Sequence, residues 1–470
     1  MVVGHVGGID YVFFKDRTRY SSAATRRNRL HARRDPGIFG EMSGRKITFL
    51  FGAGASVPFL RGLSTPLITA AYLHDNQRWR DVWSLFNKWR KRRDRASPAH
   101  VLDHLNIKEI LRLRDDIGSL LAGNRQAGNF EAHIHLLDKA TAHLQAHRPG
   151  EDFGLDSLLC TLSDPKCRWQ RTFKRSNRDG WRYGPFLARE IVCSVVLEHW
   201  IASEPERASA IKLHQDFFDG VLGMFEHVHL YSLNYDPLLY EAVKEMQFSS
   251  GFRVAGAFDE QRFSVVDSRT LAFVHGHVGF APDTTGNTLF HLDWMDAQRL
   301  RIKAAVDGHV GNWTSKGLDA NTMIVTGFDK IHGFARDPYS SYLHSFALDV
   351  LDCDCLVLVG VSLGDDHLNA FLRNSLRKGR EKAMVVVDLV QPDEVEELLS
   401  SVAPTEKMAT ILSVLRDTFG PDLEKHWQQL AGDLGTMGYG RLSHNTMLFS
   451  RGTEEFYKHG LTDDLLGQAA

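Results

Sequence analysis

The sequence of 470 residues contains few cysteines, and their spacing argues against disulfide and zinc sites. The five cysteines are Cys160, Cys167, Cys193, Cys353 and Cys355. An odd number at wide spacing is atypical of a disulfide framework and favours a reducing cytoplasm as the location. No pair of CxxC motifs is present, so the cysteines do not indicate a structural zinc site.

Long hydrophobic runs and an excess of one charge are also absent. No apolar stretch approaches the roughly 18 residues of a membrane span, and no apolar signal-peptide segment is visible at the N-terminus. The formal net charge is −2, which gives no overall basic character for binding nucleic acid. With 43% hydrophobic and 24% charged residues, the composition is that of a globular protein with a sizeable core.

The sequence is organised around one apolar segment that ends in small residues, Lys46–Ser56 (KITFLFGAGAS). Its β-branched and aromatic residues predict a buried strand of a parallel sheet. The Gly52, Ala53 and Gly54 segment predicts a sharp turn, and Ser56 is a good N-cap for a following helix. Free backbone N–H groups and the helix dipole would then form a phosphate cradle. The third glycine of GxGxxG is missing, so this pattern alone is a weak indicator of a nucleotide site.

Three later apolar runs also end in polar residues. They read HVHLYSLNYD at 227–236, LAFVHGH at 271–277 and LVLVGVSLGDD at 356–366. Further strands are expected at 322–325 and 384–387. Because ligands of open parallel sheets bind at the carboxyl ends of the strands, we predict an α/β fold with a Rossmann-like parallel sheet and a ligand across that edge.

The motifs GAGAS, SLNYD, VHGH and GVSLGDD, in this order, resemble those of the sirtuin (silent information regulator) superfamily. In particular, they are similar to those of the sirtuin-like NADases of bacterial anti-phage defence. The resemblance covers roughly residues 42–390, interrupted by a long insertion. It implies a cytoplasmic bacterial enzyme that hydrolyses NAD+ to nicotinamide and ADP-ribose and depletes NAD+ on activation. Without the zinc module of the protein-deacylating sirtuins, deacylation is disfavoured.

The sequence divides into three parts. Residues 1–41 are basic and show no helical or strand period, so we expect a disordered leader, with a basic arm for nucleic acid or a partner as the alternative. Residues 42–400 are expected to form the sirtuin-like NAD-binding domain, with a helical insertion at about 70–225 that covers the sheet edge. Residues 401–470 form a C-terminal extension that we expect to be mainly helical.

The chemistry of NAD+ cleavage and the resemblance together predict roles for eleven residues. The reaction passes through an oxocarbenium-like transition state, as in glycoside hydrolysis. Asn234 can orient the ribose or a water through its donor and acceptor, and His275 can take a proton near neutral pH. These two are the predicted catalytic residues. The predicted residues for binding the diphosphate, ribose and adenosine are Gly52, Ala53, Gly54, Ser56, Thr65, Asp236, Gly360, Ser362 and Asp388.

Other interpretations of the same residues stay open. An asparagine after a strand is often a turn residue, a single histidine is more often structural, and Asp236 and Asp365 could simply cap helices or turns. One alternative function is a catalytically silent NAD- or ADP-ribose-binding subunit. Another is a metal-dependent hydrolase in which His275 and His277, on one strand face, share a metal. Further ligands for such a site are not evident, and we expect no metal.

A constitutive NADase would drain its host of NAD+, so a cytoplasmic one needs restraint. The insertion and the extension exceed a minimal sirtuin-like core. The resemblance implies a homo-oligomer that is controlled by a separately encoded partner, such as a defence ATPase or another nucleotide-handling protein, with no membrane contact.

Overall fold

The computed structural model describes residues 2–6, 9–13, 44–93, 107–123, 125–146, 183–252, 257–264, 269–282, 289–292, 324–326, 330, 334, 337–377, 382–390, 430, 433–434, 436–443, 445–462 and 465–466. The chain divides into two units, Met1–Glu41 and Met42–Ala470. In the first unit, β1 (Val2–Val6) and β2 (Ile9–Phe13) pair as an antiparallel hairpin. The sequence pattern predicts no regular structure there. The β-branched and aromatic residues of both segments favour strands, and the arginines of the predicted leader lie outside the described residues.

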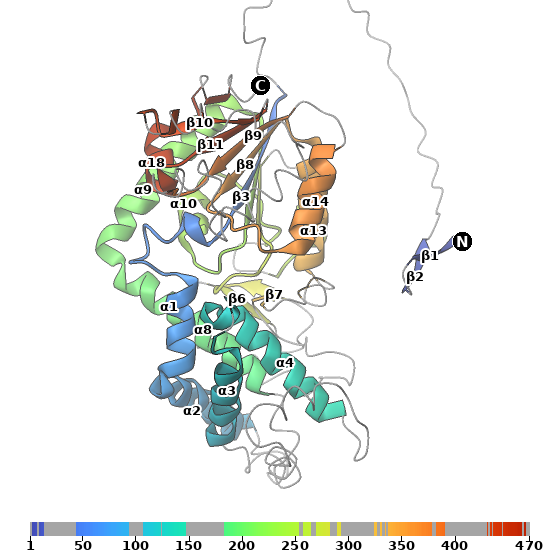
Figure 1. The fold of residues 1–470 in the computed structure, drawn as a ribbon, viewed down its shortest axis with the longest axis vertical. Helices are drawn as coiled ribbons and strands as arrows, with labels where there is room; N and C mark the ends of the chain where they lie inside the picture. The colour runs from blue at the N-terminus through green and yellow to red at the C-terminus, as the bar shows by residue number, and fades with distance from the viewer. Residues whose placement is uncertain are drawn as a thin grey trace, which may run out of the picture. The chain divides into compact units, whose positions relative to one another are not determined.

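The second unit is built on a seven-stranded sheet with the order β10-β11-β9-β8-β3-β4-β5 (Figure 1). All neighbouring strands pair in parallel except β10 and β11, which are antiparallel. This confirms the predicted Rossmann-like α/β fold. The strands are β3 (Lys46–Phe51), β4 (His227–Ser232), β5 (Arg269–Phe273), β8 (Cys355–Val359), β9 (Ala383–Val387), β10 (Tyr439–Ser443) and β11 (Thr446–Phe449).

Strand β3 lies in the middle of the sheet, between β4 and β8. The chain therefore continues to one side of β3 first and returns to its other side much later. Such a reversal of strand order opens a crevice at the carboxyl ends of the strands, which is where open α/β sheets bind ligands.

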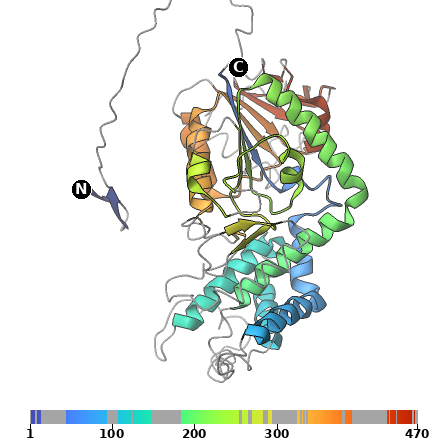
Figure 2. The same ribbon diagram turned by 180° about the vertical axis from the view of Figure 1, so that it is seen from behind.

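Helices cover both faces of the sheet, which explains why β3 and β8 are almost wholly apolar. On one face, the ring centroids of Phe49 and Phe218 lie 5.8 Å apart, and Phe218 belongs to α9 (Glu204–Met224). On the other face, the ring centroids of Tyr231 and Phe346 lie 5.0 Å apart, and Phe346 belongs to α13 (Tyr339–Asp352). Figures 1 and 2 show α14 (Asp366–Arg377) beside α13, and α10 (Leu238–Val243) and α18 (Gly452–His459) on the side of α9.

Residues 204–224 of the predicted helical insertion form α9 on a face of the sheet, and the rest of its described part is a separate group of helices packed beyond the sheet edge (Figure 1). This group contains α2 (Asn76–Arg93), α3 (Ile107–Leu121), α4 (Phe130–Ala146) and α8 (Tyr183–Ala202), together with the preceding α1 (Thr65–His74). Residues 184–197 of α8 are all buried, so α8 is the central helix of this group. Short elements complete the described fold: η1 (Ala53–Ala55), η4 (Arg125–Gly128), α11 (Glu260–Ser264), β6 (Phe280–Pro282) and β7 (Leu289–His291).

The C-terminal extension differs from the sequence prediction in its described part. It contributes two strands to the main sheet, because β11 pairs in parallel with β9 and β10 pairs with β11. It also contributes α18, which packs on α9: the ring centroids of Phe456 and Phe217 lie 5.3 Å apart. The extension is therefore part of the sheet-containing unit, whereas residues 401–429 lie outside the described residues.

Among the described helices, none combines the length and hydrophobicity that crossing a membrane requires.

Candidate active site

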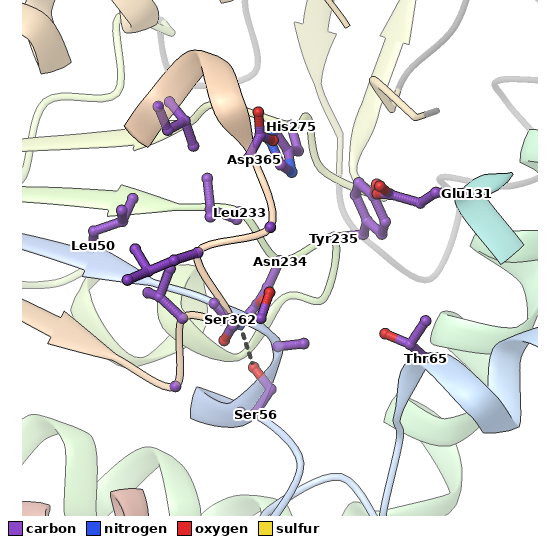
Figure 3. A pocket seen from close by; sticks show the side chains of 18 of the residues that line it. Leu50, Ser56, Thr65, Glu131, Leu233, Asn234, Tyr235, His275, Ser362 and Asp365 are labelled. Atoms are coloured by element: carbon purple, nitrogen blue, oxygen red, sulfur yellow. Dashed lines mark hydrogen bonds and ion pairs between the residues drawn. The ribbon is translucent and has the colours of Figure 1, made fainter. Parts of the chain in front are cut away.

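A cavity of about 650 Å³ lies at the carboxyl ends of β3, β4, β5 and β8 (Figure 3). Residues of the sheet edge form one side of it, and residues from the beginnings of α1 and α4 form another. The structure thus brings the eleven predicted residues to one cavity, although their roles in catalysis and binding stay predictions. They are Gly52, Ala53, Gly54, Ser56, Thr65, Asn234, Asp236, His275, Gly360, Ser362 and Asp388.

The glycines of the turn after β3 have a structural role that the sequence did not reveal. The Gly52 N–H donates to Val359 O at 2.9 Å, and the Gly54 N–H donates to Gly360 O at 3.1 Å. A Cβ on Gly52 would lie 2.4 Å from Gly360 O, and one on Gly54 would lie 2.8 Å from Gly360 Cα. These amides are therefore used within the protein, and the glycines let the turns after β3 and β8 pack backbone to backbone.

The prediction that Ser56 caps a following helix is wrong. Ser56 ends the short 3-10 helix η1, and the next α-helix, α1, begins at Thr65 with Ser64 as its N-cap. Ser64 and Thr65 both line the cavity. The first turn of a helix has N–H groups without intrahelical partners and a positive dipole end. The N-terminus of α1 therefore lies at this cavity, as do those of α4 and α14.

Asn234 lies two residues after the end of β4, and its side chain connects this segment to the turn after β3. Its Nδ2 donates to Gly52 O at 2.8 Å and to Ser56 Oγ at 3.0 Å (Figure 3). Among the described residues its side-chain oxygen has no donor, so this atom can accept a hydrogen bond from a ligand or a water. Asn234 thus stabilises the turn after β3 and also faces the cavity.

Two carboxylates that were predicted to bind the ligand accept hydrogen bonds from backbone N–H groups. Asp236 Oδ1 accepts the Leu238 N–H at 3.0 Å, as the capping interpretation expected, and burial raises the pKa of Asp236. Asp388 Oδ1 accepts the Leu389 N–H at 2.8 Å after β9. Ser362 is exposed, after Gly360, whose φ of +59° is in the left-handed region.

His275 forms the central pair of the site with Asp365. His275 Nε2 lies 2.9 Å from Asp365 Oδ2, and Figure 3 shows the two side chains together. An Nε2–H that donates to this carboxylate leaves Nδ1 as the atom that can accept a proton. Burial and the neighbouring charge of Lys330 lower the pKa of His275, and Asp365 opposes this shift. The ring is therefore neutral at neutral pH, which is the form that a general base requires.

Lys330 and Glu131 complete a buried group that the sequence analysis did not predict. Lys330 Nζ lies 3.0 Å from Asp365 Oδ2 and 3.2 Å from Glu131 Oε2. Burial alone would lower the pKa of Lys330, but the charges of Glu131 and Asp365 outweigh it and the pKa is raised. For Asp365, burial alone would raise the pKa. The hydrogen bond from His275 and the charge of Lys330 outweigh this effect and hold the pKa of Asp365 well below its usual range.

No local signal in the sequence marks Lys330 or Glu131. Glu131 is one of many charged residues in the helical insertion, and Lys330 lies in a segment without a motif. Asp365 belongs to the GVSLGDD motif, but it was interpreted only as a capping or turn residue. In the structure it does precede α14, and its carboxylate is directed to His275 and Lys330.

The second histidine of the VHGH motif does not line the cavity. The His277 ring lies 4.5 Å from that of Phe273 and 4.9 Å from that of His291, and its Nδ1 accepts the Gly279 N–H at 2.9 Å. Within the part of the chain that the structure describes, no group of three or more His, Cys, Asp or Glu side chains could hold a metal ion. These residues therefore give the metal-hydrolase interpretation no support.

Comparisons with known proteins assign no family: no protein-family model and no curated protein matches the chain. The resemblance to sirtuins thus rests on the four motifs alone.

Proposed function

We propose that the protein is an NAD+ hydrolase that cleaves the nicotinamide–ribose bond and releases nicotinamide and ADP-ribose. The observation that carries this proposal is that Asn234 and the buried His275–Asp365 pair line one cavity at the carboxyl edge of a parallel sheet. Ligands of open α/β sheets bind at this edge. The volume, about 650 Å³, is in the range of small-molecule sites.

Each residue has a defined part in the proposed reaction. The C–N bond breaks and its electron pair goes to the nicotinamide nitrogen, which leaves neutral, while the ribose becomes oxocarbenium-like. A water then adds to this carbon and transfers a proton to His275 Nδ1, from which it passes to solvent. The Asn234 oxygen accepts a hydrogen bond from the ribose or from the water, and Asp365 holds the imidazole in position. The N-terminus of α1 would stabilise a phosphate.

From the resemblance alone, we also propose that the enzyme acts in the bacterial cytoplasm as the effector of an anti-phage defence system. The same resemblance supports a homo-oligomer restrained by a separately encoded ATPase or nucleotide-handling protein. Light scattering at micromolar concentration should give a particle of more than one chain, and a strictly monomeric protein would contradict the oligomer.

The test of the proposed reaction is product analysis by chromatography after incubation of the purified protein with NAD+. Nicotinamide and ADP-ribose should form in equal amounts, and a chelator should leave the rate unchanged. Binding of NAD+ by calorimetry without turnover would instead favour the silent binding subunit. Loss of activity with the chelator, together with one stoichiometric zinc in elemental analysis, would favour the metal hydrolase.

A further inference from the structure

We infer that Lys330 and Glu131 are positioning residues that keep the His275–Asp365 pair in the arrangement a general base needs. Glu131 belongs to the first turn of α4, so the helical insertion would contribute directly to the candidate active site. The catalytic meaning of this inference rests on the proposed function, whereas its test observes His275 itself.

The contacts of the Lys330 ammonium group are the first argument. Lys330 Nζ lies 3.4 Å from His275 Nε2 and 3.5 Å from His275 Nδ1. Since it is almost equidistant from both nitrogens, and both distances are long for a hydrogen bond, it acts on the ring mainly as a charge. The same Nζ lies 3.0 Å from Asp365 Oδ2, the oxygen that pairs with His275 Nε2, and 3.2 Å from Glu131 Oε2. Lys330 therefore ties Asp365 to the insertion.

A second set of contacts connects Glu131 back to the strand ends. Tyr235 OH lies 2.9 Å from Glu131 Oε1 and 3.2 Å from Val325 O. The Val325 N–H donates to His275 O at 2.8 Å. These contacts close a ring through His275, Asp365, Lys330, Glu131, Tyr235 and Val325, in which the single Tyr235 proton is shared between Glu131 Oε1, the nearer acceptor, and Val325 O. Tyr235 directly follows Asn234. Both predicted catalytic residues are thus joined to α4.

The charges around His275 act in opposite directions. Asp365 and Glu131 favour its protonated form, whereas burial and the Lys330 charge favour the neutral one. Beyond them, the Tyr235 hydroxyl faces Glu131. The centroid of the Phe334 ring lies 6.2 Å from that of the His275 ring. The centroid of the His367 ring lies 6.3 Å from that of Phe334. Without Lys330, two carboxylates would face the imidazole with no buried cation between them. His275 would then bind a proton more readily, although its burial would still oppose the charged form.

The test is an NMR titration of ligand-free protein carrying ¹³C-labelled histidine, with the His275 signal assigned by its loss in His275→Gln. Lys330→Met should raise the pKa of His275 by about one unit or more, because the repelling charge is gone. Glu131→Gln should lower it, because an attracting charge is gone while the side chain keeps its shape. Lys330→Arg keeps the charge and should titrate close to the wild type.

Lys382→Met is the matched control, because Lys382 is also buried and bonds to Val350 O and Ser375 Oγ away from the cavity. It should lower stability and leave His275 unchanged. Opposite shifts in Lys330→Met and Glu131→Gln support the inference. Unchanged titrations, or shifts of the same sign, overturn it. Should Lys330→Met not fold, the downward shift in Glu131→Gln decides alone. Absence of NAD+ turnover in the wild type would contradict the proposed function and would not alter these titrations.

Discussion

The side-chain amide of Asn234 donates to the carbonyl oxygen of Gly52 at 2.8 Å, across 182 residues of sequence. This bond joins the segment after β4 to the turn after β3, beside the β3–β8 pair at which the strand order reverses. The predicted catalytic asparagine therefore has a structural role as well, and a variant at this position changes both stability and chemistry.

Asn234→Ala should reduce stability as well as NAD+ hydrolysis. It removes the bonds to Gly52 O and Ser56 Oγ, which should lower the free energy of unfolding by about 1–2 kcal/mol. Ser56→Ala removes one of these two bonds and also the hydrogen bond between Ser56 and the buried Asp236, so its cost should be similar. Denaturant unfolding of both variants measures the two costs. Wild-type stability in Asn234→Ala would show that the bonds do not stabilise the turn.

Gly360→Ala should destabilise the protein strongly. Gly360 has a φ of +59°, and a Cβ there would lie 2.4 Å from Ala55 N and Gly54 C. We expect a loss of more than about 2 kcal/mol, from the left-handed backbone and the clash with a neighbouring turn.

Gly220→Ala is the control for Gly360→Ala. Gly220 is exposed within α9, and a Cβ there would meet nothing within 4 Å. It should be neutral or stabilise the helix by up to about 1 kcal/mol. Thermal unfolding distinguishes the two variants, and equal stabilities would contradict the tight packing of the two turns.

The buried His214 should make the protein less stable in acid. Burial lowers the pKa of His214 to about 4, against about 6.5 when it is unfolded. Between these values the unfolded chain binds a proton that the folded one does not. This term therefore takes away stability as the pH falls from about 6.5 to 4, by about 3 kcal/mol in total.

His214→Phe should remove that part of the pH dependence, because a phenyl ring does not titrate and can keep the ring contacts with Phe59 and Tyr457, whose ring centroids lie 5.0 Å and 4.3 Å from that of His214. The slope of the unfolding free energy against pH is the measurement. Gly220→Ala, at an exposed position of α9, removes no titratable group and should keep the wild-type slope. A wild-type slope in His214→Phe would contradict the assignment.

Truncation after residue 438 should unfold or aggregate the protein instead of only changing its assembly. It removes β10, β11 and α18 and exposes the edge of β9, since β11 pairs with β9 along Thr446–Phe449. Unpaired strand edges promote aggregation. Deletion of residues 1–41, which form a unit of their own, should leave the melting temperature unchanged. A folded, monodisperse truncated protein would show that the sheet does not need its last strands.

The parallel sheet and the place of its cavity could be predicted because their signals are local. Apolar runs such as 356–359 end in polar and glycine residues, and in a parallel sheet all such ends meet at one edge. Strand β10 escaped prediction because Arg441 and Ser443 interrupt its apolar pattern, and β11 escaped because it has only four residues. β11 is stabilised by pairing with β9 and β10 by pairing with β11, contacts that the local sequence does not encode.

The site shows the same limit at the level of single residues. Ser56 has the local pattern of an N-cap, but the chain continues through further turns and α1 begins only at Thr65. Glu131 and Lys330 meet only because the helical insertion packs over the sheet edge. Neither has a neighbouring residue that would mark it, so only tertiary structure reveals the pair.

The most direct test of the central claim compares nicotinamide release from NAD+ by the wild type, His275→Gln and His344→Gln in one assay. The glutamine at position 275 can still donate to Asp365 but cannot accept the proton, so the rate should fall by about 100-fold or more with the fold retained. His344→Gln should release nicotinamide at the wild-type rate. Equal rates in all three proteins would contradict the assignment of His275 and with it the proposed active site.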